Sequence, residues 1–315
     1  MNVLRVAPNR PVGWPDVAVA VGNFDGVHRG HQELVRAMVA EARAMTGTAV
    51  VLTFDPHPGQ VLAARTAPRT LLSLEQRAEL LATLGVDQLA VLPFDRALAR
   101  LTPEAFAASV LRDTLAARAV VVGESFRFGA RRRGDVSTLA SFGKDLGFRV
   151  RALAPLLEAG RPISSSRIRE AVLAGRVREA GELLGREFFL DGVVVRGAGR
   201  GRTIGVPTAN LEPETDLLPA VGVYAGRFRD RADPTGQRHA CVVNVGRRPT
   251  FDSGALTVEA HLLGFEGDLY DHRARLFFTA RLRDERRFAG PDTLLIQIRQ
   301  DMARARALLE TPDHS

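Results

Sequence analysis

Apolar runs alternate with amphipathic patterns over the first half of the chain. The runs are rich in β-branched residues, as expected of strands buried on both faces, and between them apolar residues recur every three or four positions, as in helices. Predicted strands cover residues 17–21, 49–54, 89–94 and 119–126. Predicted helices begin at His31, Ser73, Thr102 and Asp135. Strands and helices that alternate in this way predict a parallel sheet in a doubly wound α/β fold.

The pattern changes near residue 184. Two short helical segments, 169–175 and 177–185, are followed by short apolar runs separated by glycines and turn residues. The runs predicted to form strands lie at residues 191–197, 222–228, 239–246, 256–264 and 274–283. This spacing is typical of a small antiparallel barrel, and one long helical pattern closes the chain. We place the boundary in the turn at 183–187, which gives domains 1–184 and 185–315.

Length and composition narrow the class of protein. The 315 residues suffice for about two domains, and 45% hydrophobic with 25% charged residues argues against wholesale disorder. No apolar stretch approaches the roughly 18 residues of a membrane-spanning helix, and the N-terminus lacks the apolar core of a secretory signal. We therefore expect a cytoplasmic protein with no membrane partner. The single cysteine, Cys241, excludes an internal disulfide and a multi-cysteine zinc site.

Basic residues outnumber acidic ones by 43 to 36. Lys144 is the only lysine, which excludes a Walker-A loop because that loop requires Gly-Lys-Ser/Thr. Arginine binds phosphate through two parallel hydrogen bonds, so a nucleotide or a nucleic acid fits the charge. A nucleic-acid-binding module is the alternative from a different class. Aromatic residues make up only 6% of the chain and do not interleave with the arginines as stacking platforms would, so we expect no nucleic-acid partner.

A segment rich in glycine and histidine follows the first predicted strand. In an open α/β sheet, ligands bind at the carboxyl ends of strands, where glycines let the backbone approach a phosphate and the next helix offers free N–H groups. His28 and His31 can point into one cavity and stabilise charge that develops during group transfer. The candidate residues of this segment for binding nucleotide phosphates are Gly22, Phe24, Asp25, Gly26, His28, Gly30 and His31.

A second glycine-rich segment, residues 197–210, reads as a loop around a ligand, because so many glycines are untypical of a strand interior. Thr208 and Asn210 each offer one oxygen, two positions apart. Such a pair suits Mg²⁺, which binds few protein ligands alongside phosphate oxygens and water. The candidate residues of this loop for binding nucleotide phosphates are Gly199, Gly201, Thr203, Gly205 and Pro207.

Together these segments resemble a known family. Gly-x-Phe-Asp-Gly-x-His-x-Gly-His at 22–31, with Thr-Phe-Asp-Pro-His-Pro at 53–58, is similar to the prokaryotic bifunctional riboflavin kinase/FAD synthetase. Residues 122–129 and 163–169 extend the similarity, and Pro-Thr-Ala-Asn at 207–210 resembles the flavokinase signature. The resemblance implies a Rossmann-like nucleotidylyltransferase domain followed by a six-stranded antiparallel β-barrel flavokinase domain.

For the N-terminal domain, the resemblance implies adenylyl transfer from ATP to FMN, which gives FAD and pyrophosphate. The residues expected at the ATP phosphates are His28, His31, Ser164 and Arg167, of which the histidines and the arginine are the candidate catalytic residues. The residues expected at the flavin are Phe54, His57 and Phe126. Ser125 stands where the family usually has Asn or Asp; its hydroxyl still donates and accepts, but over a shorter reach, and we include it among the ATP-binding residues.

For the C-terminal domain, the resemblance implies ATP-dependent phosphorylation of riboflavin to FMN. Glu259 matches the family position for the base that accepts the proton of the 5′-hydroxyl, and Thr208 and Asn210 would hold Mg²⁺. The residues expected at the flavin in this domain are Asn244, Arg283 and Phe288. The expected small molecules are thus riboflavin, FMN, FAD and ATP, and the sequence does not predict the oligomeric state.

Two alternatives keep part of this interpretation. Ser125 leaves open a chain that phosphorylates riboflavin but has lost adenylyl transfer. An adenylyltransferase for a different phosphate acceptor would explain residues 22–31, but it leaves Pro-Thr-Ala-Asn at 207–210 without a role.

Overall fold

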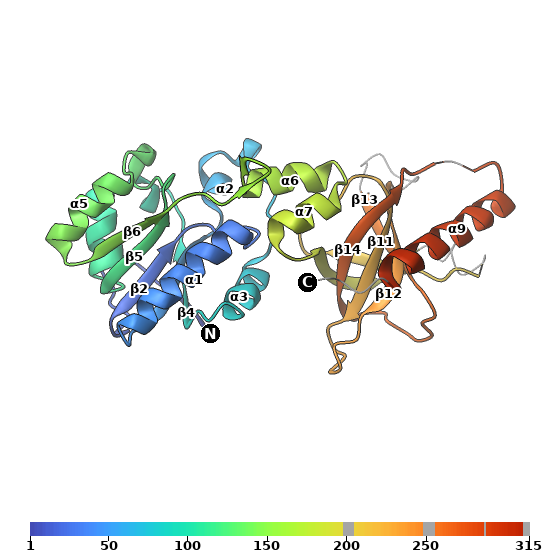
Figure 1. The fold of residues 1–315 in the computed structure, drawn as a ribbon, viewed down its shortest axis with the longest axis horizontal. Helices are drawn as coiled ribbons and strands as arrows, with labels where there is room; N and C mark the ends of the chain where they lie inside the picture. The colour runs from blue at the N-terminus through green and yellow to red at the C-terminus, as the bar shows by residue number, and fades with distance from the viewer. Residues whose placement is uncertain (198–204, 248–255, 287, 311–315) are drawn as a thin grey trace. The chain divides into compact units, whose positions relative to one another are not determined.

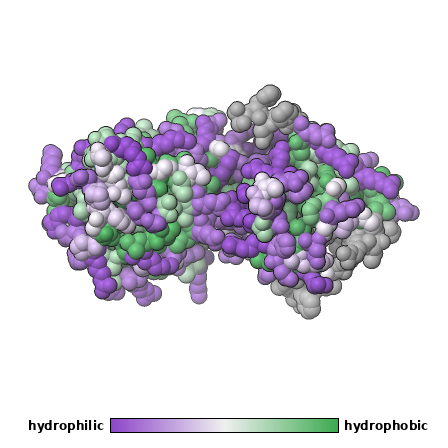
Figure 2. All heavy atoms as spheres, turned by 90° about the horizontal axis from the view of Figure 1, so that it is seen from below, coloured by the Kyte–Doolittle hydropathy of each residue, from purple (hydrophilic) through white to green (hydrophobic). Residues whose placement is uncertain are grey.

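The structure is a computed structural model that describes residues 1–197, 205–247, 256–286 and 288–310. Its contacts divide the chain into two compact units, Met1–Ser165 and Ser166–Ser315, and each is described by itself (Figure 1). On the face shown in Figure 2, hydrophilic residues cover most of the surface of both units. Among the described residues, no helix is both long and apolar enough to span a membrane.

A parallel sheet of six strands forms the centre of the first unit, in the order β1-β4-β3-β2-β5-β6. The strands are β1 (Asn2–Arg5), β2 (Val17–Val21), β3 (Ala49–Asp55), β4 (Gln88–Pro93), β5 (Ala117–Gly123) and β6 (Arg149–Leu153). The predicted α/β fold with a parallel sheet is confirmed. The sequence predicted only β2 to β5, because the edge strands β1 and β6 are largely exposed and carry no continuous apolar run.

Helices cover both faces of this sheet. Val19 of β2 packs with Phe106 in one core cluster, whereas Ala18 and Ala20, which point to the opposite face, lie against α1 (Arg29–Ala44). The other helical elements are α2 (Pro58–Leu62), η1 (Ala64–Thr66), α3 (Leu74–Ala82), η2 (Leu98–Arg100), α4 (Pro103–Phe106), η3 (Ala107–Arg112), η4 (Ala130–Arg132) and α5 (Val136–Leu146). A short hairpin follows, β7 (Leu157–Glu158) with β8 (Arg161–Pro162).

The second unit is built around a closed antiparallel barrel in the order β10-β13-β12-β11-β14-β9. Its strands are β9 (Phe188–Val195), β10 (Ala209–Pro213), β11 (Gly222–Asp230), β12 (His239–Arg247), β13 (Leu256–Leu262) and β14 (Arg273–Arg283). The last helix, α9 (Pro291–Glu310), packs across β11, β12 and β14 (Figure 1). The predicted six-stranded antiparallel barrel is confirmed.

The contacts divide the chain at Ser165/Ser166, earlier than the 184/185 boundary predicted from the sequence. The intervening helices, α6 (Ser165–Leu173) and α7 (Val177–Leu184), group with the barrel. The Ala220 amide donates to the Val172 carbonyl at 3.3 Å, and α7 packs its buried face against β9 and β14. The change from helices to strands therefore comes later in the chain than the change from one packing unit to the other.

A buried ion pair joins β9 to β14 on the outside of the barrel. Asp191 and Arg275 lie opposite each other in the strand register, and two hydrogen bonds of 2.7 Å join the guanidinium to the carboxylate. Both residues are only 5% exposed, and the Arg275 guanidinium lies 4.0 Å from the centre of the Phe189 ring. Arg186 is close by: burial and the charge of Arg275 lower its pKa to about 10. Asp191 therefore neutralises a crowded positive region.

We predict that Asp191→Ala lowers the free energy of unfolding by about 3–5 kcal/mol, because Arg275 loses its carboxylate partner while it stays buried beside Arg186. Urea unfolding followed by circular dichroism measures the loss. The matched control is Glu214→Ala, which breaks the exposed pair with Arg273 on the same strand and should cost at most about 1 kcal/mol. Equal effects of the two substitutions would contradict the assignment.

Candidate active sites

A cavity of about 710 Å³ opens at the carboxyl ends of the central strands of the first unit. Gly22 and Asn23 after β2, Phe54 of β3, Phe94 after β4 and Ser125 after β5 line it. β2 and β5 are neighbours in the sheet. From β2 the chain continues to β3 on one side, and from β5 it continues to β6 on the other side, so the two connections run in opposite directions. Such a switch point is where open α/β sheets bind ligands.

Aromatic rings form much of the cavity wall. Phe54 and Phe94 meet edge to face with ring centres 5.8 Å apart, and Phe126 and Phe128 lie nearly parallel at 5.4 Å. Phe106 also lines the cavity. Two pairs of rings with apolar surfaces between them suit a flat aromatic ligand. Arginines add positive charge to this wall at positions 127, 131 and 132.

His57 joins this wall to the turn after β2. Its Nδ1 accepts the amide N–H of Gly59 at 3.0 Å and so caps α2. Its Nε2 lies 3.2 Å from the side-chain amide nitrogen of Asn23. His57 and Phe54, both expected at the flavin, thus lie on the same side of the unit as Asn23 and Gly22.

The two histidines of the turn stack on each other at the start of α1. His28 is the N-cap, whose Nδ1 accepts the His31 amide at 3.3 Å, and the ring centres are 3.6 Å apart. Burial, and then the charge of His28, lower the pKa of His31 well below its usual 6.5. His31 Nδ1 is buried and has no hydrogen-bond partner among the described residues. The helix start therefore offers a neutral imidazole at the positive end of the α1 dipole, a position that favours a phosphate group.

The other residues of this turn hold its shape. The Asp25 carboxylate accepts the amides of Leu71 and Leu72 at 2.9 and 3.2 Å, so it caps the segment before α3. Ser165 donates its hydroxyl proton to the Asp25 carbonyl at 2.7 Å. Gly26 has φ of 90°, a conformation that strongly favours glycine.

The remaining candidates of this site lie around the turn. A side chain on Gly30 would meet the His28 ring at 3.3 Å. Phe24 is 1% exposed, with its ring centre 5.2 Å from that of His31. Ser164 precedes α6, and Arg167 belongs to the second unit, where its Nε lies 3.7 Å from Glu179.

Strand register brings the predicted base of the barrel next to the predicted metal ligand. Asn210 of β10 lies directly opposite Glu259 of β13, and Glu259 lies opposite Asn244 of β12. The neighbours Val258 and Ala260 are buried in the barrel, so Glu259 points to its outer face. A row of two amides and a carboxylate therefore crosses three adjacent strands.

A cavity of about 400 Å³ adjoins this row. Thr208 and Asn210 line it together with Pro207, whose carbonyl is 2.7 Å from Nδ1 of His261. A hydroxyl and an amide oxygen here are hard ligands of the kind that Mg²⁺ prefers. Gly205 precedes the cavity with φ of 75°. Gly199, Gly201 and Thr203 lie outside the described residues.

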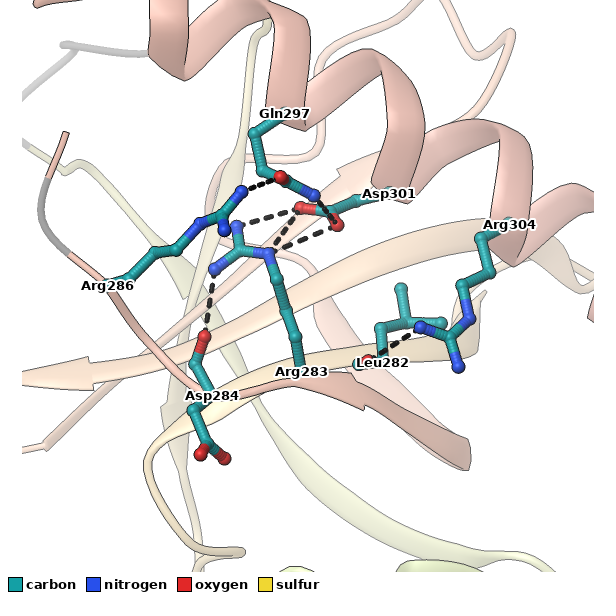
Figure 3. Close-up of polar contacts among 7 residues, drawn as sticks. All are labelled: Leu282, Arg283, Asp284, Arg286, Gln297, Asp301 and Arg304. Atoms are coloured by element: carbon teal, nitrogen blue, oxygen red, sulfur yellow. Dashed lines mark hydrogen bonds and ion pairs between the residues drawn. The ribbon is translucent and has the colours of Figure 1, made fainter.

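Arg283 fixes the last helix to the barrel. Its Nε and Nη2 donate to the Asp301 carboxylate at 2.8 to 3.1 Å, and its Nη1 donates to the Asp284 carbonyl at 2.9 Å (Figure 3). Gln297 donates to the same carboxylate at 2.8 Å and accepts from Arg286. The guanidinium of Arg283, expected at the flavin, is thus held by α9.

Phe288 lies beside a separate cavity of about 380 Å³ that α9 borders with Thr293 and Ile296. Glu285, which precedes Phe288 in the chain, lies close to Asn244 of the polar row. A Cβ atom built on Gly246 would lie 3.0 Å from Glu285 Oε1 and 3.1 Å from Asn244 Nδ2. Among the described residues, no group of three or more His, Cys, Asp and Glu is arranged to bind a metal. A metal ion in the barrel site would therefore be held by the oxygens of Thr208 and Asn210 together with oxygens of the bound substrate.

Known proteins share both units. The family models that match are FAD synthetase over residues 12–167 and riboflavin kinase over residues 184–309. A bifunctional riboflavin kinase/FMN adenylyltransferase from Escherichia coli (strain K12) is 36% identical over 91% of each chain, and one from Pseudomonas fluorescens is 37% identical over 100% of each. The chain belongs to this family.

A solved structure extends the comparison. A protein from Streptococcus pneumoniae described as a macrolide-efflux protein matches with a TM-score of 0.88 at 32% identity. The match covers 96% of this bifunctional riboflavin kinase/FMN adenylyltransferase family member and 98% of that protein. The same succession of an α/β unit and a barrel therefore occurs in both chains.

Sequence reasoning missed several residues that line the cavities of this family member. Phe94 directly follows β4, so the rule that ligands bind at carboxyl ends of strands would have found it. Phe106 comes from α4, where no local pattern distinguishes it from a core residue. Phe265 and Tyr270 line the barrel cavity from the connection between β13 and β14, and they carry no motif.

The low pKa of His31 predicts a pH dependence of stability. The unfolded chain binds a proton at His31 near pH 6.5, where the folded chain does not, so the free energy of unfolding falls as the pH drops below about 6.5. Urea unfolding at about pH 7 and about pH 5 should show a larger loss for the wild type than for His31→Asn, which cannot titrate. Parallel losses in the two proteins would contradict a depressed pKa.

Proposed function

We propose that domain 1–184 converts FMN and ATP to FAD and pyrophosphate, and that domain 185–315 phosphorylates riboflavin with ATP to give FMN. The observation that carries the division is the placement of two unlike sites in the parts matched by the two family models. One is an aromatic cavity beside a histidine-capped helix, and the other is the row of two amides and a carboxylate on the barrel. The product of the barrel is then a substrate of the α/β unit.

In adenylyl transfer, an oxygen of the FMN phosphate attacks the α-phosphorus of ATP, and the bond to pyrophosphate breaks. We assign the ATP phosphates to the start of α1, where His28 and His31 lie, with Ser164 as a further ligand. A neutral His31 with a buried ring nitrogen supports this assignment, because such a group gains a partner when a phosphate arrives. Phe54, His57 and Phe126 hold the isoalloxazine ring in the aromatic cavity.

Ser125 is the one departure from the family pattern within this cavity. Its side chain lines the cavity and is exposed, so its hydroxyl is accessible to a ligand. Because this hydroxyl reaches less far than the Asn or Asp side chain usual in the family, a chain that makes FMN and has lost adenylyl transfer is the second candidate function.

In the barrel, Glu259 accepts the proton of the riboflavin 5′-hydroxyl as that oxygen attacks the γ-phosphorus of ATP, and the bond between this phosphorus and ADP breaks. Thr208 and Asn210 would hold Mg²⁺, which would neutralise charge on the transferred phosphoryl group. The position of Asn210 directly opposite Glu259 supports this arrangement, because the base and the metal ligand must reach the same phosphoryl group. Asn244, Arg283 and Phe288 are assigned to the flavin side. A cytoplasmic location agrees with the use of ATP.

The test is a chromatographic time course of the purified protein with riboflavin, ATP and Mg²⁺, in which FMN and FAD are measured separately. FMN that appears first and FAD that follows support both activities. FMN alone favours the second candidate function. If neither FMN nor FAD forms, the proposal is wrong. Omission of Mg²⁺ in the presence of a chelator should abolish both products.

We predict that Glu259→Gln abolishes FMN formation, because the amide cannot accept the hydroxyl proton, and leaves FAD formation from supplied FMN unchanged. The general-base contribution sets the expected loss at about 10²-fold or more. Glu212→Gln, on the neighbouring strand β10 and exposed, is the matched control and should keep both rates. Equal loss of both activities would contradict the division between the domains.

We predict that replacement of both His28 and His31 by Ala stops FAD synthesis while FMN accumulates. The two rings are the side chains that face each other at the start of α1, and their loss removes the groups assigned to the ATP phosphates. The time course with riboflavin and ATP measures both products in one reaction, so FMN formation is the internal control. Undiminished FAD formation would remove the histidines from the site.

A further inference from the structure

The turn between β2 and α1 is strained. Phe24 has φ of 49° and Val27 has φ of 41°, the left-handed region that bulky and β-branched residues disfavour. Gly26, between them, has φ of 90°. A turn with this conformation persists only when the surrounding structure fixes it, so its anchors determine where its side chains lie.

One anchor comes from α3. Arg77 Nη1 donates to the Asn23 carbonyl at 2.9 Å and to the Thr53 hydroxyl at 3.0 Å. The Thr53 hydroxyl in turn donates to the same carbonyl at 3.1 Å. The Asn23 carbonyl therefore accepts two hydrogen bonds, one from a helix and one from the end of β3. Its position relative to the sheet is fixed from both sides.

The same helix is tied to the turn a second time. The Asp25 carboxylate accepts the amides of Leu71 and Leu72, directly before α3. The turn thus supports the start of α3, and α3 returns Arg77 to the turn. Because these contacts run in both directions, the turn and the helix adopt their positions together.

The burial of the Arg77 guanidinium is energetically unfavourable, which is unusual for a residue with a purely structural role. The residue is 7% exposed, and its Nε has no hydrogen-bond partner among the described residues. Burial lowers the pKa of its guanidinium, and the nearby charges of Asp25 and Asp55 oppose that effect. A buried charge directed at a carbonyl and a hydroxyl stabilises less than one paired with a carboxylate in a bidentate contact.

The residue held by this anchor lies in the cavity wall. Asn23 lines the aromatic cavity, and its side-chain amide lies 3.2 Å from His57 Nε2. A shift of the Asn23 backbone would therefore move a group that faces the ligand and release its contact with His57. Arg77 itself does not line this cavity.

We propose that Arg77, with Thr53, is a positioning residue for adenylyl transfer: it holds the Asn23 carbonyl so that the Asn23 side chain faces the flavin cavity next to His57. The inference rests on the proposed function of domain 1–184. It assigns to Arg77 no contact with either substrate.

The experiment compares Arg77→Met, Arg77→Lys, Thr53→Val and the double variant Arg77→Met/Thr53→Val in the full-length chain. Initial rates of FAD formation from FMN and ATP give kcat and KM for each substrate, and FMN formation from riboflavin is measured in the same preparations. Arg36→Met is the matched control, because Arg36 is an exposed arginine of the same unit that pairs with Glu33. It should retain both activities.

Arg77→Met should lower kcat/KM for FMN by about 10- to 100-fold, as expected for a misplaced binding group, while the KM for ATP changes less than about twofold. Arg77→Lys should recover part of the loss, since an ammonium group can still donate to the carbonyl. Thr53→Val should reproduce the effect more weakly. The double variant should be no worse than Arg77→Met within about twofold, because both substitutions remove support from one carbonyl.

Unchanged kcat/KM for FMN in a folded Arg77→Met protein would overturn the proposal, and so would losses that multiply in the double variant. If Arg77→Met loses both activities through misfolding, Thr53→Val decides: a selective loss of FAD formation supports the proposal, and none overturns it. A wild-type protein that makes FMN but no FAD from supplied FMN would instead overturn the proposed function itself.

Discussion

The turn that joins β2 to α1 adopts a conformation that its own residues disfavour, and the N-terminal site depends on what compensates for it. Phe24 has a left-handed backbone, yet its side chain is 1% exposed and its ring packs 5.2 Å from that of His31. Burial of one phenylalanine contributes about 1.5–3 kcal/mol, enough to offset the strain of one such residue. The buried ring therefore fixes the backbone that presents His28 as the helix cap and stacks it on His31.

The barrel positions its polar groups by a different constraint, the register of its strands. Closure leaves no free strand edge, so each strand pairs on both sides. Val258 and Ala260 face the core, which directs Glu259 outward, opposite Asn210 and Asn244. A slip of one residue would bury the carboxylate and expose two apolar side chains, and the free energy of that exchange keeps the register unique. Here regular structure places the site, with no strained turn involved.

This difference explains what the sequence predicted. The strands β2 to β5 and the start of α3 carry local signals, such as the Ser73–Gln76 capping box, and these predictions were confirmed, whereas β1, β6 and β10 lack such signals and were missed. The placement of Glu259 beside Asn210 needs a register that no local pattern specifies. The grouping of α6 and α7 with the barrel depends on long-range packing. The 184/185 boundary was predicted from the change between helical and strand patterns, which carries no information on that packing. The place of Phe106 in the cavity wall also depends on long-range packing, and no motif in its helix indicates a ligand.

The arginine content has a structural use in both units. Arg77 joins α3 to the β2–α1 turn, Arg275 joins β14 to β9, and Arg283 joins β14 to α9. Each lies between two segments that are distant in sequence and donates from more than one nitrogen or to more than one acceptor. Lysine carries one compact ammonium on a flexible stem and cannot reproduce the two-nitrogen contacts that Arg275 and Arg283 make with carboxylates. A chain with Lys144 as its only lysine therefore uses its positive charges partly as cross-links between elements, and two of these cross-links border the proposed sites.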